Sequence, residues 1–115
     1  MTAGADQLVA VTVTFGNAEE AEAVASELVE ARLAACAQVW PICSIYRWQD
    51  KVERAQEHRL EAKTTAAALP ALEARVRERH SYDVPEIIAV PVVHASADYA
   101  RWVRESVSAQ AAGRQ

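Results

Sequence analysis

The sequence predicts an α+β domain of the ferredoxin-like type, a βαββαβ sandwich with a long hairpin between its second and third strands and an extra C-terminal helix. A mostly apolar, strand-like run begins at Leu8, helical periodicity appears near residues 20 and 70, and two long strand-like segments separate the helices. No repeat and no linker rich in Pro, Gly or Ser divides residues 1–115, so one domain is expected, with an ordered core over about 8–107. The polar, alanine-rich tail 108–115 is expected to fray.

The first two elements are a strand and a helix. Both parities of Leu8 to Phe15 are mostly apolar, which is typical of a buried central strand. Gly16 then ends the strand, and Asn17 suits the N-cap of a helix whose first turns are acidic. The apolar stripe of this helix is predicted to contain Ala21, Val24, Ala25, Leu28, Val29, Arg32 and Leu33.

Two long strands follow. The segment 34–49 is rich in Val, Ile, Trp, Cys and Tyr, and Pro41 within it marks an edge position or a bend. Asp50 and Lys51 are expected to form the turn into a second strand that runs from Val52 to Thr64. In the second half of that strand, one face is predicted to hold Leu60, Ala62 and Thr64, and the other Glu57, Glu61 and Lys63.

A helix, a strand and a final helix complete the chain. Helical spacing of apolar residues predicts the second helix over about 66–80, with Pro70 in its first turn. The next strand is expected over 87–93, at a sheet edge because it contains Pro91. The last helix is predicted over 97–107. The first two helices would then cover one face of a four-stranded antiparallel sheet.

Composition restricts the class of function. The formal net charge is −4, and the helical Arg residues alternate with Glu73 and Glu78, so a nucleic-acid partner is not expected. The longest uncharged stretch, 33–46, is too short to span a bilayer as a helix, so no membrane association is expected. The first residues lack the pattern of a secretory signal, which predicts the cytoplasm and free thiols at Cys36 and Cys43.

The predicted hairpin is too long for a domain of this size. A compact chain of 115 residues has a diameter of roughly 34 Å, whereas each hairpin arm would extend about 46 Å. One face of the first arm carries Trp40, Ile42, Ser44, Tyr46 and Trp48. These side chains either pack under the domain's own helices or form a subunit interface. We favour the interface, because long apolar strands pair or aggregate unless another copy covers them.

Several spaced motifs occur in order along the chain. They are Leu33-Ala34-Ala35-Cys36, then Ser44, Tyr46 and Trp48, then Glu57, Leu60, Lys63 and Thr64, and finally the run from His80 to Ile87. Together they resemble the CutA (divalent-cation tolerance) family, and the run is similar to its His-Pro-Tyr-x-x-Pro-Glu-Ile motif. The resemblance implies a homotrimer related in shape to PII signalling proteins, with hairpins paired across subunits. It links the chain to tolerance of divalent cations, chiefly copper.

The resemblance also points to candidate metal ligands. Some family members bind copper through a first-strand Cys and His residues before the Pro-Tyr motif. Val13 and Arg79 occupy two of those positions here, which leaves His80, with Cys36 as the other candidate for copper or another divalent cation. The alternatives are that Cys36 is a small buried hydrophobe and that His80 bonds the last carbonyls of its helix. No metal is expected to be needed for folding.

A ligand cleft between subunits is the second site hypothesis. Its residues would come from the hairpin and from the connection after the second helix: Tyr46, Trp48, Glu57, Lys63, Tyr82 and Glu86. The simpler alternative is a cross-subunit ion pair between Glu57 and Lys63.

Three functions are therefore weighed. The favoured one is a trimeric binding or scaffold protein that responds to copper and other divalent metal ions. The second is a PII-like trimeric sensor that binds a small anionic ligand in intersubunit clefts. An enzyme is not expected, because no Gly-rich phosphate loop, nucleophile elbow or metalloprotease spacing is present.

Overall fold

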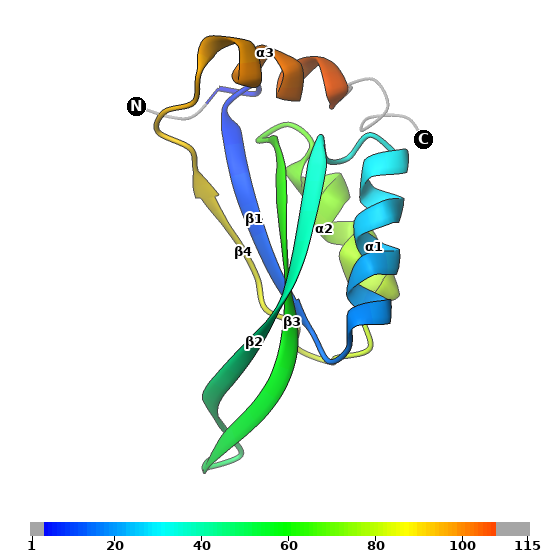
Figure 1. Ribbon diagram of the computed structural model, residues 1–115, viewed down its shortest axis with the longest axis vertical. Coiled ribbons are helices and arrows are strands. Elements are labelled where there is room, and N and C mark those ends of the chain that lie inside the picture. Colours follow the sequence, from blue (N-terminus) through cyan, green and yellow to red (C-terminus); the bar gives the residue numbers. More distant parts are fainter. Residues whose placement is uncertain (1–3, 108–115) are drawn as a thin grey trace.

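The computed structural model describes residues 4–107 and has the predicted ferredoxin-like order of elements with an added C-terminal helix (Figure 1). The elements are β1 (Leu8–Phe15), α1 (Ala18–Glu30), β2 (Cys36–Trp48), β3 (Lys51–Thr65), α2 (Leu69–Arg79), β4 (Ile87–Pro91) and α3 (Ala97–Ser106). The tail 108–115, which was expected to fray, lies outside the described residues.

The strands form one antiparallel sheet in the order β2-β3-β1-β4. β1 is central, as its apolar character on both parities predicted. β2 and β4 are the edge strands, where Pro41 and Pro91 are tolerated because an edge strand has backbone groups that need no ladder partner. β4 ends at Pro91 rather than at the predicted Val93, since the chain then leaves the sheet and Val93 is 96% exposed.

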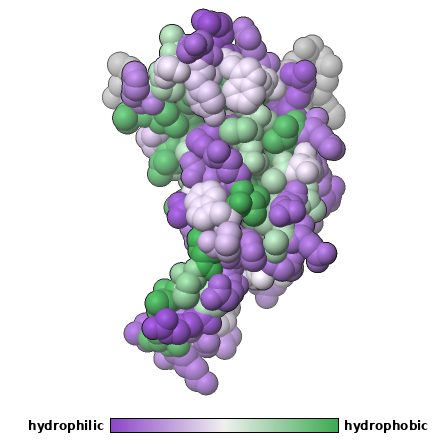
Figure 2. Space-filling view, in the orientation of Figure 1, coloured by the Kyte–Doolittle hydropathy of each residue, from purple (hydrophilic) through white to green (hydrophobic). Residues whose placement is uncertain are grey.

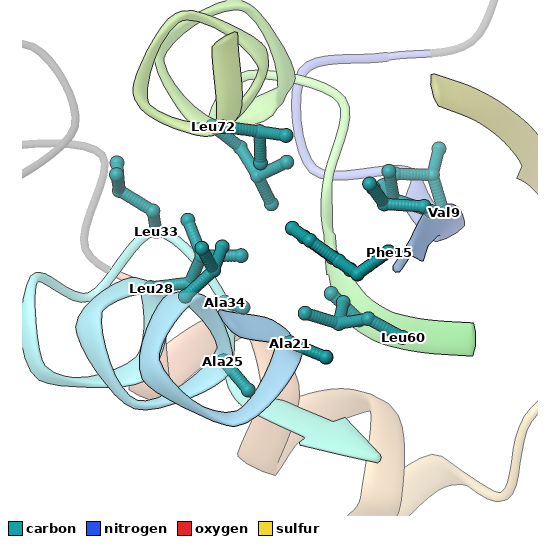
Figure 3. Close-up of a cluster of buried hydrophobic side chains, with 14 residues drawn as sticks. Val9, Phe15, Ala21, Ala25, Leu28, Leu33, Ala34, Leu60 and Leu72 are labelled. Atoms are coloured by element: carbon teal, nitrogen blue, oxygen red, sulfur yellow. The ribbon is translucent and has the colours of Figure 1, made fainter. Parts of the chain in front are cut away.

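Helices α1 and α2 cover one face of the sheet, as predicted (Figure 1). Figure 3 shows Phe15 of β1 lying between Leu60 of β3 and Leu72 of α2, above the small residues of α1. Phe15, Leu28, Leu60 and Leu72 are fully buried. Burial of each such side chain contributes about 1.5–3 kcal/mol, so this cluster anchors the strand ends that build the site.

Helix α1 begins as predicted but ends earlier. The Asn17 side chain accepts a hydrogen bond from the Glu20 backbone N–H at 2.8 Å, which confirms the N-cap. At the other end, Arg32 has a φ of 62°, and the Leu33 N–H reaches back to the Leu28 carbonyl at 2.9 Å. This left-handed cap ends the helix at Glu30, so the predicted continuation of the stripe to residues 32 and 33 is wrong.

The hairpin of β2 and β3 projects from the domain (Figure 1). Its turn is made by Gln49 and Asp50, both with positive φ, and not by Asp50 and Lys51, because Lys51 already pairs with Trp48. Pairing of β1 with β3 stops at His58, so the tip is a two-stranded ribbon. The molecule measures 43 × 29 × 22 Å, longer than the roughly 34 Å of a compact chain.

Helix α3 covers only one end of the second sheet face. It packs there in a separate apolar cluster made of Leu8, Ala35, Ala68, Ala100, Val103 and Val107. Elsewhere on this face Trp40, Ile88 and Val90 remain 38%, 52% and 54% exposed. Within residues 4–107, no helix has the length and apolar character needed to cross a membrane.

Helix α2 begins at Leu69 rather than near 66, because residues 66–68 form a turn after β3. Pro70 lies in its first turn, as predicted.

Candidate functional site

A cavity of about 480 Å³ opens where the hairpin meets the connection between α2 and β4. This volume falls in the range of small-molecule sites. The residues that carry its chemistry are Tyr46 and Trp48 from β2, Glu57 from β3, and Tyr82, Asp83 and Glu86 from the connection. Five of the six residues predicted for a ligand cleft therefore line one cavity.

Glu57 and Tyr82 form the inner wall of this cavity. The Tyr82 hydroxyl donates to Glu57 Oε2 at 2.7 Å, and Glu57 is only 7% exposed. The pKa of the Tyr82 phenol is raised, first by burial and second by this hydrogen bond to the carboxylate. The phenol therefore stays neutral and serves as a donor. Gly16 makes room for it, since a Cβ there would lie 3.2 Å from the Tyr82 hydroxyl oxygen.

His80 supports Tyr82 from behind. Its side chain is 0% exposed, and its ring stacks on Phe15 with centroids 4.3 Å apart. The Tyr82 backbone N–H donates to His80 Nδ1 at 3.1 Å, so Nε2 carries the hydrogen and donates to the Thr14 carbonyl at 2.7 Å. The ring therefore bonds to β1. It does not bond to the last carbonyls of its own helix, which was the structural role that the sequence had suggested for it. Both nitrogens are engaged, which leaves no lone pair for a metal ion.

The connection that carries Tyr82 is tied to α1. Glu20 accepts hydrogen bonds from the Ser81 backbone N–H at 2.8 Å and from the Ser81 hydroxyl at 3.0 Å. A Pro at position 81, as in the motif that the sequence resembles, has no N–H and would lack the first bond. In this chain, Ser81 therefore holds the connection to α1 through two hydrogen bonds.

Lys63 does not belong to the cavity. It lies six residues from Glu57 along β3, a distance of about 20 Å. Its ammonium group pairs with Glu61 at 3.2 Å and donates to Gln38 at 3.1 Å, beside a different cavity near α3. Within one chain, this geometry therefore keeps Lys63 out of the cavity and away from Glu57. A cross-subunit ion pair between Glu57 and Lys63 stays a prediction.

The two candidate metal ligands lie at opposite ends of the sheet. Cys36 pairs across the sheet with Lys63, which pairs with Ala10, whereas His80 contacts Phe15. Phe15 lies five positions after Ala10 along β1, a distance of about 17 Å. Cys36 is half-buried, and its sulfur lies 3.5 Å from the Tyr99 hydroxyl. Among residues 4–107, no three His, Cys, Asp or Glu side chains are grouped to hold a metal ion.

Asp83 is the charged cavity residue that the sequence reasoning missed. It lies directly beside Tyr82 in the connection, and a wider search of that motif for carboxylates would have included it.

Residues 9–106 match the family model described as "CutA1 divalent ion tolerance protein". The chain belongs to the CutA family. It is 45% identical over 97 residues to the divalent-cation tolerance protein CutA of Thermus thermophilus, covering 84% of this chain and 94% of that protein. It is 44% identical over 103 residues to human protein CutA, covering 86% of this chain, and spans only 58% of the length of that relative.

Solved CutA structures share the fold. The crystal structure of CutA from Xylella fastidiosa superposes with a TM-score of 0.86 at 35% identity, over 89% of this chain and 99% of that one. The Thermus thermophilus structure gives a TM-score of 0.85 at 43% identity, over 88% and 99% of the two chains. The predicted family and fold class are thereby confirmed. Relatives carry different location names: a CutA of Arabidopsis thaliana is called chloroplastic, and that of Archaeoglobus fulgidus periplasmic.

Proposed function

We propose that this CutA chain works as a cytoplasmic homotrimer, a binding or scaffold protein without catalytic activity that supports tolerance of copper and other divalent cations. The family assignment supports the cation-tolerance role. The observation that carries the assembly is the projecting tip of the hairpin, where Ile45, Tyr46, Trp48 and Val52 are 57%, 43%, 49% and 66% exposed.

The tip carries exposed apolar side chains on both of its faces. Strand alternation places Ile45 and Val52 on one side and Tyr46 and Trp48 on the other. Figure 2 shows apolar side chains at the surface of the projecting hairpin. A two-stranded ribbon is marginally stable in water, and this one has no third strand beyond His58. A neighbouring copy that packs on the side of Ile45 and Val52 would bury these two side chains and stabilise the ribbon.

Direct metal binding would need more than one copy of the chain. Within residues 4–107, no cluster of three ligating side chains exists, and His80 and Cys36 are about 17 Å apart along the sheet. A copper or other divalent-cation site would therefore be shared between subunits. The net charge of −4 argues against nucleic acid as a further partner.

A PII-like sensor of a small ligand is the second candidate function. The cavity beside Tyr82 supports it, since its volume of about 480 Å³ suits a small molecule. The charge of the cavity walls does not support the anionic ligand that the sequence had suggested, because Glu57, Asp83 and Glu86 line the cavity and Lys63 does not.

Two measurements test the proposal. Light scattering should give about three times the chain mass of 12.6 kDa, and a monodisperse monomer at micromolar concentration would overturn the trimer. Calorimetry with copper and zinc should then detect binding to the trimer. If neither metal binds the trimer, a direct cation role is wrong. Binding that is unchanged in His80→Ala and Cys36→Ser would exclude those two residues as ligands.

A further inference from the structure

The charges of the side chains that line the cavity beside Tyr82 determine whether it favours a cation or an anion. Three of its lining side chains are carboxylates, Glu57, Asp83 and Glu86, and among the described lining residues none is Lys, Arg or His. An anion that enters would be repelled, whereas a cation would be attracted.

Glu57 is a specific hydrogen-bond acceptor for such a cation. It is 7% exposed, and the Tyr82 hydroxyl bonds Oε2 only. Within residues 4–107, no Lys, Arg or His nitrogen lies at ion-pair distance from it. A desolvated carboxylate accepts several hydrogen bonds and gains most from a charged donor. An ammonium group at the remaining oxygen would supply that donor.

The aromatic residues of the cavity favour the same ligand class. Tyr46, Trp48 and Tyr82 border the carboxylates. Aromatic faces attract organic cations and also bury their carbon atoms. The volume of about 480 Å³ is far larger than a bare metal ion requires and suits an organic ion.

We propose that this cavity binds a small organic cation that carries a primary ammonium group on an apolar body, with Glu57 accepting from the ammonium and the aromatic side chains packing on the body. The proposal rests on the small-ligand role proposed above and names the ligand class for that site.

A matched set of probes tests the charge. Calorimetry would compare 2-phenylethylammonium with the neutral 2-phenylethanol and the anionic 3-phenylpropionate, which share the same apolar body. The ammonium ion is expected to bind about tenfold or more tightly than the alcohol, and the anion to bind most weakly, because only the cation makes a charge-assisted bond to Glu57. Equal or tighter binding of 3-phenylpropionate, or no binding of the ammonium ion, would overturn the proposal.

Variants test the residue. Glu57→Gln should weaken binding of the ammonium ion about tenfold and leave binding of the alcohol unchanged. Glu61→Gln is the matched control, since Glu61 lies on the same face of β3 but outside this cavity. If the buried Glu57→Gln variant fails to fold, Glu86→Gln at an exposed position should still weaken the ammonium ion a few-fold. Equal affinities in wild type and both variants would refute the role of the carboxylates.

The solution mass of each sample separates the two proposals. A trimer that does not bind the ammonium ion contradicts the ligand class and leaves the trimeric assembly standing. A monomer that binds it contradicts the assembly and leaves the ligand class standing.

Discussion

His80 holds one wall of the cavity in place without lining the cavity itself. The imidazole joins the Thr14 carbonyl of β1 to the Tyr82 backbone N–H, and it is stacked on Phe15. Tyr82 in turn directs its hydroxyl at Glu57. The contact between Tyr82 and Glu57 therefore depends on the buried His80 ring. A search for metal ligands would assign that ring to a different role.

Replacement of His80 by Ala should lower the free energy of unfolding by about 2–4 kcal/mol, because it leaves a cavity against Phe15 and removes two hydrogen bonds. Urea denaturation measures the change. The exposed His94→Ala is the control and should alter stability by no more than about 0.5 kcal/mol. Equal stability of both variants would contradict the structural role.

The raised pKa of Tyr82 predicts a loss of stability in alkali. The pKa of an unfolded-state phenol is about 10, and the pKa of Tyr82 in the folded state is higher. The stability that Tyr82 contributes is therefore fully present below about pH 10 and is lost as the pH rises towards the folded-state pKa. The wild type should therefore lose stability above about pH 10, and Tyr82→Phe should lose less. Urea denaturation at several pH values measures both. Parallel curves for the two proteins would show that Tyr82 is not the group responsible. Tyr99, whose pKa is raised to about 12 chiefly by its bond to Cys36, contributes equally to both curves.

Among the elements, the β2–β3 hairpin combines a regular ladder with an unfavourable turn. The pairing is continuous from Cys36↔Lys63 to Trp48↔Lys51. At the tip, however, Gln49 and Asp50 have φ values of 51° and 67°, in the left-handed region that Gly and Asn adopt more easily. Apolar packing along the hairpin must therefore compensate for the turn.

Substitution of Asp50 by Gly should stabilise the hairpin by about 0.5–1 kcal/mol, because Gly adopts positive φ without a steric penalty. Slower hydrogen exchange at the backbone amides beside the turn would report the gain. Lys51→Gly provides the opposite control, since Lys51 is in the extended strand β3 and exchange should become faster there. An identical exchange rate in Asp50→Gly and wild type would mean that the turn is not strained.

The whole molecule leaves apolar surface on the hairpin tip and on the sheet face beyond α3. Trp40, Ile88 and Val90 on that face add to the exposed residues of the tip. A single chain cannot cover both regions, because α1 and α2 lie on the other face and α3 reaches only one end. Association of identical chains would remove both from water.

Charges placed at the tip should break such an assembly. Ile45→Asp combined with Val52→Asp is expected to weaken association at least about 100-fold, since each carboxylate would have to be desolvated at the interface. The monomer should stay folded, because both residues lie beyond the part of β3 that pairs with β1. Sedimentation or light scattering measures the mass. Val93→Asp, at a position 96% exposed, should leave the mass unchanged. An unaltered mass in the tip variant would exclude the tip from the interface.

The short-range features of this chain were predictable from its sequence. The apolar residues on both parities of Leu8 to Phe15 identified the central strand, and Asn17 identified the start of α1, because these signals depend on residues close together in the chain. The cavity was predicted in part, since five of its residues belong to motifs that the family resemblance had already grouped. Errors of one to three residues occurred at element ends, two of them where Arg32 and the turn of the hairpin adopt positive φ without Gly.

The sequence by itself determined the order of elements, the central and edge strands, the overlong hairpin and the CutA resemblance. Only the tertiary structure decided that Lys63 lies about 20 Å from Glu57, that both nitrogens of His80 are used inside the fold, and that Cys36 contacts Tyr99 instead of His80. The physical reason is that periodicity and capping act along the chain, whereas the charge of a cavity depends on strand register and on the path of a connection through space.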